Sequence, residues 1–505
     1  MAEADPRASA TGDATRVTAV IVGAGMSGLL AGIKLKERGI DDFVILERSD
    51  SVGGTWYDNH YPGASCDVPS HLYSYSFAPN PNWTRAFARQ PEILAYFRDI
   101  AERYGLNAHI SFATEVAGAR FDEGAGEWSV AAADGRRWTA RILIVGAGQL
   151  NRPWSPDIEG KDSFAGVQFH SARWNRDVDL TGKRVASIGN GASAVQYIPE
   201  IAPLAEKLTI FQRSSNWIIP RPDEEITPAQ HARFRRFPIL RKALRLLIYS
   251  INESRWGAFR KAGSWASKRL EKMARDQLAA QVHDPKLREL LTPDYPIGCK
   301  RILITDDYYP AVCRPNVEIV TEPIARIVPE GIETRSGRKI PLDVIVWGTG
   351  FETAGFLMPI DIVGRAGQRL HDVWANGAEA YRGVTVTGFP NIFVMYGPNT
   401  NLGHNSIIFM SERQMDYILP LIDTILARDL ALLDVKPEVQ AAYNRRLQDR
   451  LASTVWAANC GSWYKHDGKI TNNWSGSTIE FWRQMRKVDL ASYEMVPRAK
   501  ARAAA

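Results

Sequence analysis

The sequence predicts an α/β protein built from two Rossmann-like dinucleotide-binding units. Two segments, which begin near residues 17 and 184, have the order strand, glycine-rich turn and helix that is typical of a nucleotide-binding βαβ unit. The chain has 505 residues, too many for a single hydrophobic core, so two or three domains are expected. A further segment, rich in basic and aromatic residues, has helical spacing and predicts a helical insertion.

The first glycine turn follows an apolar, β-branched run at residues 17–22 and precedes a helical pattern at residues 29–38. In Gly23-Ala24-Gly25-Met26-Ser27-Gly28, the first glycine permits the tight turn and the second lets the backbone approach a pyrophosphate. The third glycine, Gly28, allows close packing of the helix on the strand. The helix N-terminus then faces the phosphates.

An acidic residue supports this first site. A second apolar run at residues 43–46 ends in Glu47, nineteen residues after Gly28, where a carboxylate binds ribose hydroxyls. The whole pattern favours a dinucleotide site over a glycine turn that binds nothing.

The second unit combines a strand at residues 184–188 with a helix at residues 194–201. The next strand, 208–211, is followed by Gln212-Arg213-Ser214 and carries no terminal carboxylate. An arginine there attracts the 2′-phosphate of NADPH, so NADPH is preferred over NADH. The expected binding residues are Gly189, Gly191, Ser193, Ala194, Arg213 and Ser214.

These motifs resemble the class B flavoprotein monooxygenases, which bind FAD at the first turn and NADPH at the second. The resemblance spans nearly the whole chain. Phe164-x-Gly166-x-x-x-His170-x-x-x-Trp174-Asn175 is similar to the fingerprint of the type I Baeyer-Villiger monooxygenases, with Asn175 where the family usually has Pro or Asp. The resemblance implies that His170 and Trp174 couple the two domains.

A second signature of the same group follows Glu47. It consists of Gly53-Gly54-Thr55-Trp56 and Tyr61-Pro62-Gly63-Ala64-Ser65-Cys66-Asp67, with Ser65 where many members have Arg. The resemblance implies that Gly54, Thr55, Trp56 and Asp67 lie near the flavin. It also implies that Asp67 orients an active-site arginine, which maps onto Arg301 in Lys300-Arg301-Ile302-Leu303.

The implied activity is that of an FAD-dependent, NADPH-consuming monooxygenase acting on a small-molecule ketone and O2. In this family a C4a-peroxyflavin inserts one oxygen atom next to the carbonyl, giving an ester or lactone. Arg301 suits the catalytic role because a guanidinium remains charged and can keep a peroxide deprotonated. Asp67 can hold it by a charge-assisted bond. The structural alternative is a plain internal ion pair.

The resemblance also implies the domain order, because segments similar to the FAD motifs of the family occur again at residues 343–351 and 396–406. The second unit is therefore expected to be inserted in the first. The predicted ranges are 17–153 and 344–495 for the FAD-binding domain, 154–221 and 300–343 for the NADPH-binding domain, 222–299 for the helical insertion, and 1–16 and 496–505 for flexible tails.

Composition and cysteine usage limit the other possibilities. Hydrophobic residues make up 45% of the chain and no eighteen-residue apolar run is present, which predicts a soluble protein. The net charge of +6 suits an anionic cofactor and does not indicate nucleic acid. Without a Cys-x-x-Cys pair we expect no disulfide framework, no metal site and a reducing cytoplasm. The cysteines are Cys66, Cys299, Cys313 and Cys460.

Two regions are less specific. Residues 233–275 contain thirteen Lys or Arg against two Glu, interleaved with apolar residues at helical spacing. We expect a helical insertion with a solvated basic face, and the alternative is a helix that binds a membrane surface or a partner.

The C-terminal region is expected to be core, with a ketone pocket as the alternative. Its marker residues are Trp456, Cys460, Trp463, Tyr464 and Trp474.

Three other activities compete with this interpretation. A flavin-containing N- or S-oxygenase is the nearest alternative, and Trp174, Asp67 and Arg301 weigh against it. A disulfide reductase needs a cysteine pair near the first unit, where only Cys66 is present. A non-catalytic, FAD-containing sensor or membrane-surface protein that uses residues 233–275 would bind flavin that NADPH does not reduce. No motif identifies the ketone or the oligomeric state.

Overall fold

The computed structural model describes residues 14–352, 355–466 and 468–498. Most of the two predicted tails lies outside these residues. The inner ends of the tails were predicted wrongly, because Thr15 and Arg16 pair with Trp138 and Thr139, and Val496 and Pro497 pair with strand residues near 430. Backbone pairing with a neighbouring strand orders these residues.

An eight-stranded sheet forms the first unit, in the order β17-β4-β5-β6-β1-β2-β3, with β18 paired to β6. The pairs β4–β5 and β5–β6 are antiparallel and the other pairs are parallel. The strands are β1 (Thr15–Val22), β2 (Phe43–Leu46), β3 (Ile110–Ser111), β4 (Val116–Asp122), β5 (Glu127–Ala132), β6 (Arg137–Val145), β17 (Asp361–Val363) and β18 (Ile392–Val394).

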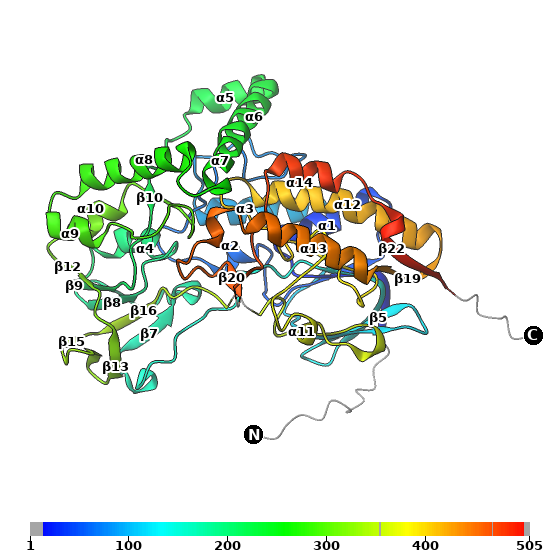
Figure 1. Ribbon diagram of the computed structural model, residues 1–505, viewed down its shortest axis with the longest axis horizontal. Coiled ribbons are helices and arrows are strands. Elements are labelled where there is room, and N and C mark those ends of the chain that lie inside the picture. Colours follow the sequence, from blue (N-terminus) through cyan, green and yellow to red (C-terminus); the bar gives the residue numbers. More distant parts are fainter. Residues whose placement is uncertain (1–13, 353–354, 467, 499–505) are drawn as a thin grey trace, which may run out of the picture.

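A five-stranded parallel sheet forms the second unit, in the order β12-β9-β8-β16-β7. Its strands are β7 (Val167–His170), β8 (Arg184–Ile188), β9 (Lys207–Phe211), β12 (Val317–Val320) and β16 (Val344–Trp347). They all fall between β6 and β17 in the chain, so the second unit is inserted in the first, as predicted. Figure 1 shows the two units side by side.

The predicted boundary at residue 344 was wrong. Strand β16 pairs with β7 and β8, so it completes the second sheet before the chain returns to the first one. The physical reason is burial, because all four residues of β16 are buried and a central parallel strand needs a neighbour on each edge.

Each glycine turn connects the predicted strand to the predicted helix. Helix α1 (Met26–Glu37) follows β1, and α4 (Ala194–Ile201) follows β8. The other elements of the two units are α2 (Thr55–Asp58), α3 (Gln90–Arg103), β10 (Ile218–Ile219), β11 (Leu303–Ile304), α10 (Tyr308–Val312), β13 (Ile324–Val328), β14 (Gly331–Thr334), β15 (Lys339–Pro341) and α11 (Leu370–Val373).

The predicted helical insertion is confirmed. It contains α5 (Pro228–Arg236), α6 (Pro238–Ser254), α7 (Trp256–Arg260), α8 (Trp265–Gln281) and α9 (Pro285–Leu290). In Figure 1, α5 and the adjoining part of α6 project beyond the rest of the molecule. None of the described helices is both long and apolar enough to cross a membrane.

The C-terminal region packs on the first unit and is largely core. Trp456, Tyr464 and Trp474 are buried, as expected, whereas 39% of Trp463 is exposed. The elements are α12 (Ile407–Ala427), β19 (Leu430–Val435), α13 (Pro437–Leu451), β20 (Lys465–His466), β21 (Lys469–Ile470), α14 (Thr478–Met485) and β22 (Tyr493–Pro497).

Candidate active site

A cavity of about 640 Å³ lies where the two units meet. Both glycine turns contribute to its wall, and so do the segment after Glu47, the Lys300-Arg301 pair and residues near Trp463. The predicted site residues that line it are Gly23, Gly25, Glu47, Gly54, Thr55, Trp56, Asp67, Gly191, Ser193 and Arg301. The structure therefore brings most of the predicted site together, although these residues are far apart in the sequence.

The first glycine turn has the geometry that a pyrophosphate site requires. A Cβ on Gly28 would lie 1.8 Å from the carbonyl oxygen of Gly23, so only glycine lets the helix pack this closely on the strand. At Gly25, by contrast, the only described atoms within 4 Å of such a Cβ belong to the backbone of Gly54, at 3.6 Å or more. No described side chain caps α1, so its first N–H groups are available to a phosphate.

Glu47 lies at the end of β2, where it was predicted. Its side chain is buried, and its carboxylate accepts hydrogen bonds from the N–H groups of Ala24 at 2.6 Å and Ser49 at 2.8 Å. Each carboxylate oxygen has a second lone pair, so Glu47 can still bind ribose hydroxyls at the cavity wall. These contacts, together with the glycine turn, fit FAD.

The second glycine turn is built in the same way. Gly189 has φ +106°, and a Cβ there would lie 2.4 Å from the carbonyl oxygen of Gly348. No described atom lies within 4 Å of a Cβ on Gly191, so the backbone is open to a ligand there. The amide of Asn190 donates to Gln212 at 2.7 Å and to the Ser214 carbonyl at 3.0 Å, which holds the turn against the end of β9.

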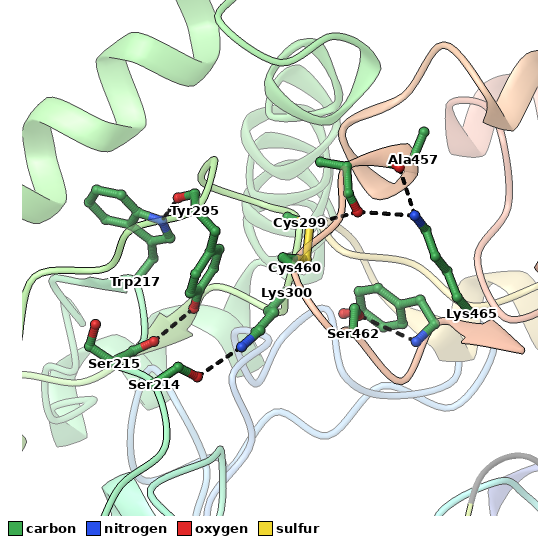
Figure 2. The surroundings of a disulfide bond; sticks show 12 residues. Ser214, Ser215, Trp217, Tyr295, Cys299, Lys300, Ala457, Cys460, Ser462 and Lys465 are labelled. Atoms are coloured by element: carbon green, nitrogen blue, oxygen red, sulfur yellow. Dashed lines mark hydrogen bonds between the residues drawn. A yellow bond between two sulfur atoms is a disulfide. The ribbon is translucent and has the colours of Figure 1, made fainter. Parts of the chain in front are cut away.

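Lys300 joins the predicted pair Arg213 and Ser214 beside the second turn. Its ammonium group donates to the hydroxyl of Ser214 at 2.8 Å (Figure 2). Burial and the nearby charge of Arg213 lower the pKa of Lys300. The sequence gives no sign of a role for Lys300, because only the fold brings it next to β9. The two cations and the hydroxyl suit the 2′-phosphate of NADPH.

Arg301 and Asp67 form the predicted ion pair inside the cavity. Nε of Arg301 donates to Oδ2 of Asp67 at 2.9 Å, and Nη2 donates to the same oxygen. The charge of Asp67 raises the pKa of Arg301, so the guanidinium remains protonated. The pair is not sealed in a core, because 35% of the Arg301 side chain is exposed and it lines the cavity wall.

Two tyrosines lie close to this charged pair. Burial raises the pKa of Tyr464 to about 12 and also raises the pKa of Tyr396. Both phenols are therefore neutral at physiological pH. Within the part of the chain that the structure describes, Asp67 is the one carboxylate within salt-bridge distance of Arg301.

His170 and Trp174 lie between the two units but outside the cavity lining. Burial lowers the pKa of His170 to about 4, so this histidine is neutral and suited to structure rather than to proton transfer. The ring of Trp174 packs against Phe169 and Tyr197 of the second unit, with centroids 5.1 and 5.3 Å away. Its backbone carbonyl lies 3.1 Å from Nε2 of His60, which belongs to the first unit.

Other contacts between the units were missed by sequence reasoning. The side-chain oxygen of Gln196 on α4 accepts a hydrogen bond from the Tyr61 hydroxyl at 2.9 Å, and its amide nitrogen donates one to the carbonyl of Ser65 at 3.0 Å. Arg221 donates to the hydroxyl of Ser65 at 2.9 Å. No local pattern marks such a pairing.

A disulfide corrects one prediction. Cys299 and Cys460 are bonded, with their Cα atoms 6.4 Å apart, whereas the scattered cysteines argued against a disulfide framework (Figure 2). The two residues are 161 positions apart, and the fold rather than any local motif brings them together. The bond ties the Lys300-Arg301 segment to Gly461, Ser462 and Trp463, which line the same cavity.

Removing this disulfide is expected to destabilise the protein. Cys299→Ala with Cys460→Ala should lower the free energy of unfolding by about 3–5 kcal/mol, because the bond closes a long loop in the unfolded chain. Guanidinium unfolding followed by tryptophan fluorescence measures this change. The control is Cys313→Ala, at an exposed free cysteine, with an expected change within about 0.5 kcal/mol. Equal stability of the double variant and the parent would contradict the prediction.

Known proteins are similar to this chain along nearly its whole length. Residues 20–248 match a family model described as pyridine nucleotide-disulphide oxidoreductase. A Baeyer-Villiger monooxygenase of Pseudomonas aeruginosa is 44% identical, covering 94% of this chain and 90% of that protein. An FAD-binding monooxygenase of Aspergillus niger is 41% identical, covering 95% of this chain and 82% of that protein.

Solved structures agree. The structure of an oxidized steroid monooxygenase bound to NADP superposes with a TM-score of 0.85 at 34% sequence identity, covering 96% of this chain and all of that one.

Proposed function

The chain belongs to the Baeyer-Villiger monooxygenase family, and from that premise we propose that Arg301, held by Asp67, is its principal catalytic residue. The enzyme is an NADPH-dependent flavoprotein that inserts one oxygen atom of O2 next to a ketone carbonyl. Bound FAD supplies the oxygen-transfer chemistry, and the protein supplies binding, orientation and charge.

The observation that carries the proposal is the position of the Arg301–Asp67 pair. Its guanidinium faces the cavity between the two glycine turns, where both nucleotides would bring their reactive rings. A permanently charged donor there stabilises negative charge that develops on oxygen during attack on a carbonyl. Asp67 contributes by fixing the guanidinium through two hydrogen bonds to one carboxylate oxygen.

The cofactors are assigned to the two units. The first glycine turn, Glu47 and the segment from Gly54 to Trp56 would hold FAD, and the second turn with Arg213, Ser214 and Lys300 would hold NADPH. On this assignment the FAD-binding domain consists of residues 17–153 and the part of the chain that follows β16. The NADPH-binding domain ends with β16. His170 and Trp174 couple the two domains. The use of NADPH fits a cytoplasmic enzyme.

Oxygen labelling tests the activity. The FAD-loaded enzyme, NADPH and ¹⁸O2 are incubated with a cyclic ketone and, separately, with a thioether. The expected product is a lactone that carries one ¹⁸O atom, detected by mass spectrometry. Sulfoxide formation without any lactone would favour the flavin-containing N- or S-oxygenase. Bound flavin that NADPH fails to reduce would favour a non-catalytic sensor.

Nucleotide preference tests the phosphate site. Arg213→Ala and Lys300→Ala should each raise the KM for NADPH about 10- to 100-fold and leave the KM for NADH nearly unchanged, because each removes a charge-assisted bond to the 2′-phosphate. Steady-state oxidation of the two nucleotides measures this. Lys183→Ala, at an exposed lysine of the same unit, is the control. An equal rise in the KM for NADPH and for NADH would contradict the assignment of Arg213 and Lys300 to the 2′-phosphate.

A further inference from the structure

Helix α6 (Pro238–Ser254) has one face held on the molecule and another exposed to solvent. On the inner face, Arg245 donates to the carbonyls of His71 at 2.7 Å and Ser74 at 3.0 Å. On the same face the hydroxyl of Tyr249 lies 2.7 Å from that of Thr478. This side holds the helix on the molecule, and it is the side that core packing explains.

The outer face of α6 is aliphatic and exposed to solvent. The exposed fractions reach 68% for Ile239, 64% for Leu246, 56% for Leu247 and 50% for Ile251, and that of Leu240 is 41%. Their spacing places them on one side of the helix along nearly its whole length. We expected the exposed face to be basic. A continuous aliphatic stripe of this kind marks a surface that something apolar covers.

Basic side chains lie on both sides of this stripe along the chain. They are exposed and form no ion pair with any residue that the structure describes, unlike Lys272 and Arg275 further along, which pair with Asp276 and Glu271. They are Arg233, Arg235, Arg236, Lys242, Arg260, Lys261, Lys268 and Arg269. Trp265, next to Arg269, is 75% exposed.

Acidic groups do not balance these charges. Between residues 228 and 270 the sequence has one acidic residue, Glu253. Its carboxylate accepts hydrogen bonds from the Thr478 N–H at 2.8 Å and from the Asn405 amide at 2.9 Å, so it is engaged on the inner side. The exposed surface of residues 228–270 is therefore both aliphatic and positively charged.

We propose that this surface docks on an anionic lipid membrane. The aliphatic stripe of α6 enters the boundary between headgroups and acyl chains, and the unpaired basic residues contact lipid phosphates. Charge complementarity selects this occupant. A second copy would bring an equally positive surface to the interface, and a nucleic acid would leave the aliphatic stripe in water. The projection of α5 and α6 lets a flat surface reach them (Figure 1).

Vesicle flotation of the full-length, FAD-loaded enzyme tests the proposal. One set of vesicles is phosphatidylcholine alone, and the other contains equal amounts of phosphatidylcholine and phosphatidylglycerol. We expect binding to the anionic vesicles to be at least about tenfold stronger than to the neutral ones, and to weaken as salt is added. Binding to neither set, or equal binding to both, overturns the proposal.

Matched variants locate the contact. Leu246→Ser with Leu247→Ser removes aliphatic area, and Arg260→Gln with Lys261→Gln removes charge. Each pair should weaken partitioning into anionic vesicles about tenfold or more. The controls are Leu204→Ser and Lys339→Gln, at exposed residues outside the insertion. FAD content and the rate of NADPH oxidation should stay unchanged in all of them, because none of these residues lines the cavity.

Two other outcomes count against lipid docking. If both variant pairs bind anionic vesicles as strongly as the wild-type protein does, this surface is not the contact. The second outcome would come from sedimentation velocity. It would be a dimer that forms as the protein concentration rises and that Leu246→Ser with Leu247→Ser abolishes. The stripe would then be an interface between copies of this chain, and the lipid assignment would be wrong.

Discussion

Arg301→Ala is expected to lose ketone oxygenation by about a thousandfold or more while keeping its FAD. The substitution removes the positive charge that faces the cavity and leaves the Asp67 carboxylate without its partner. Removal of one preorganised donor from an oxyanion site costs about a hundred- to a thousandfold, and an unpaired negative charge nearby adds to the loss. Ester or lactone yield per NADPH consumed, measured by gas chromatography, gives the effect.

Two further variants separate catalysis from structure. Arg301→Lys keeps a charge but cannot reproduce the two hydrogen bonds to Asp67, so we expect only partial recovery of product. Asp67→Asn should keep both the fold and the flavin, and reduce product yield through a less well-placed guanidinium. Thermal unfolding and the flavin spectrum serve as controls. If Arg301→Ala forms ester at the parental rate, the pair is a plain internal ion pair.

Gly28→Ala is expected to yield a protein without FAD. A Cβ at this position would lie 1.8 Å from the Gly23 carbonyl oxygen, and both atoms are fixed by the packing of α1 on β1. Relief of the overlap must move the turn that would cradle the pyrophosphate, so flavin occupancy should fall at least about tenfold, with a loss of stability of a few kcal/mol. The ratio of flavin to protein absorbance in the purified variant measures occupancy.

The control for this variant is Gly257→Ala. Gly257 lies in helix α7, and the nearest described atom to its added Cβ would be 3.5 Å away, at ordinary contact distance. Alanine also suits a helix better than glycine, so stability and flavin content should be unchanged or slightly higher. Parental flavin occupancy in Gly28→Ala would remove the first glycine turn from its assigned role.

The nucleotide-binding units could be predicted closely from local sequence. Strands β2 and β8 and helix α4 have the predicted bounds. At these places a β-branched run, the glycines of a tight turn and a regular helical pattern all predict the same strand-turn-helix unit. Such local signals do not depend on distant residues. Arg301 and Asp67 were paired correctly only through the family resemblance, because they are 234 positions apart.

Features that depend on distant contacts could not be predicted. Cys299 and Cys460 carry no local sign of their bond, and β16 belongs to the second sheet because both of its neighbours are there. Helix α6 illustrates a different limit. Periodicity shows that it has an apolar face but not which side is covered, because Arg245 and Tyr249 hold the other side through partners elsewhere in the chain.

The insertion of the second unit also sets the order in which the first can be completed on the ribosome. Strand β6 emerges early, but its neighbour β18 is made only after the whole second sheet, since Ile392–Val394 pair with Leu143–Val145. β5 already pairs with Arg137–Ala140, so at ~5–20 residues per second Leu143–Val145 wait for some tens of seconds with this edge uncovered. During that interval the unpaired backbone groups at the end of β6 are a place where the nascent chain can pair wrongly.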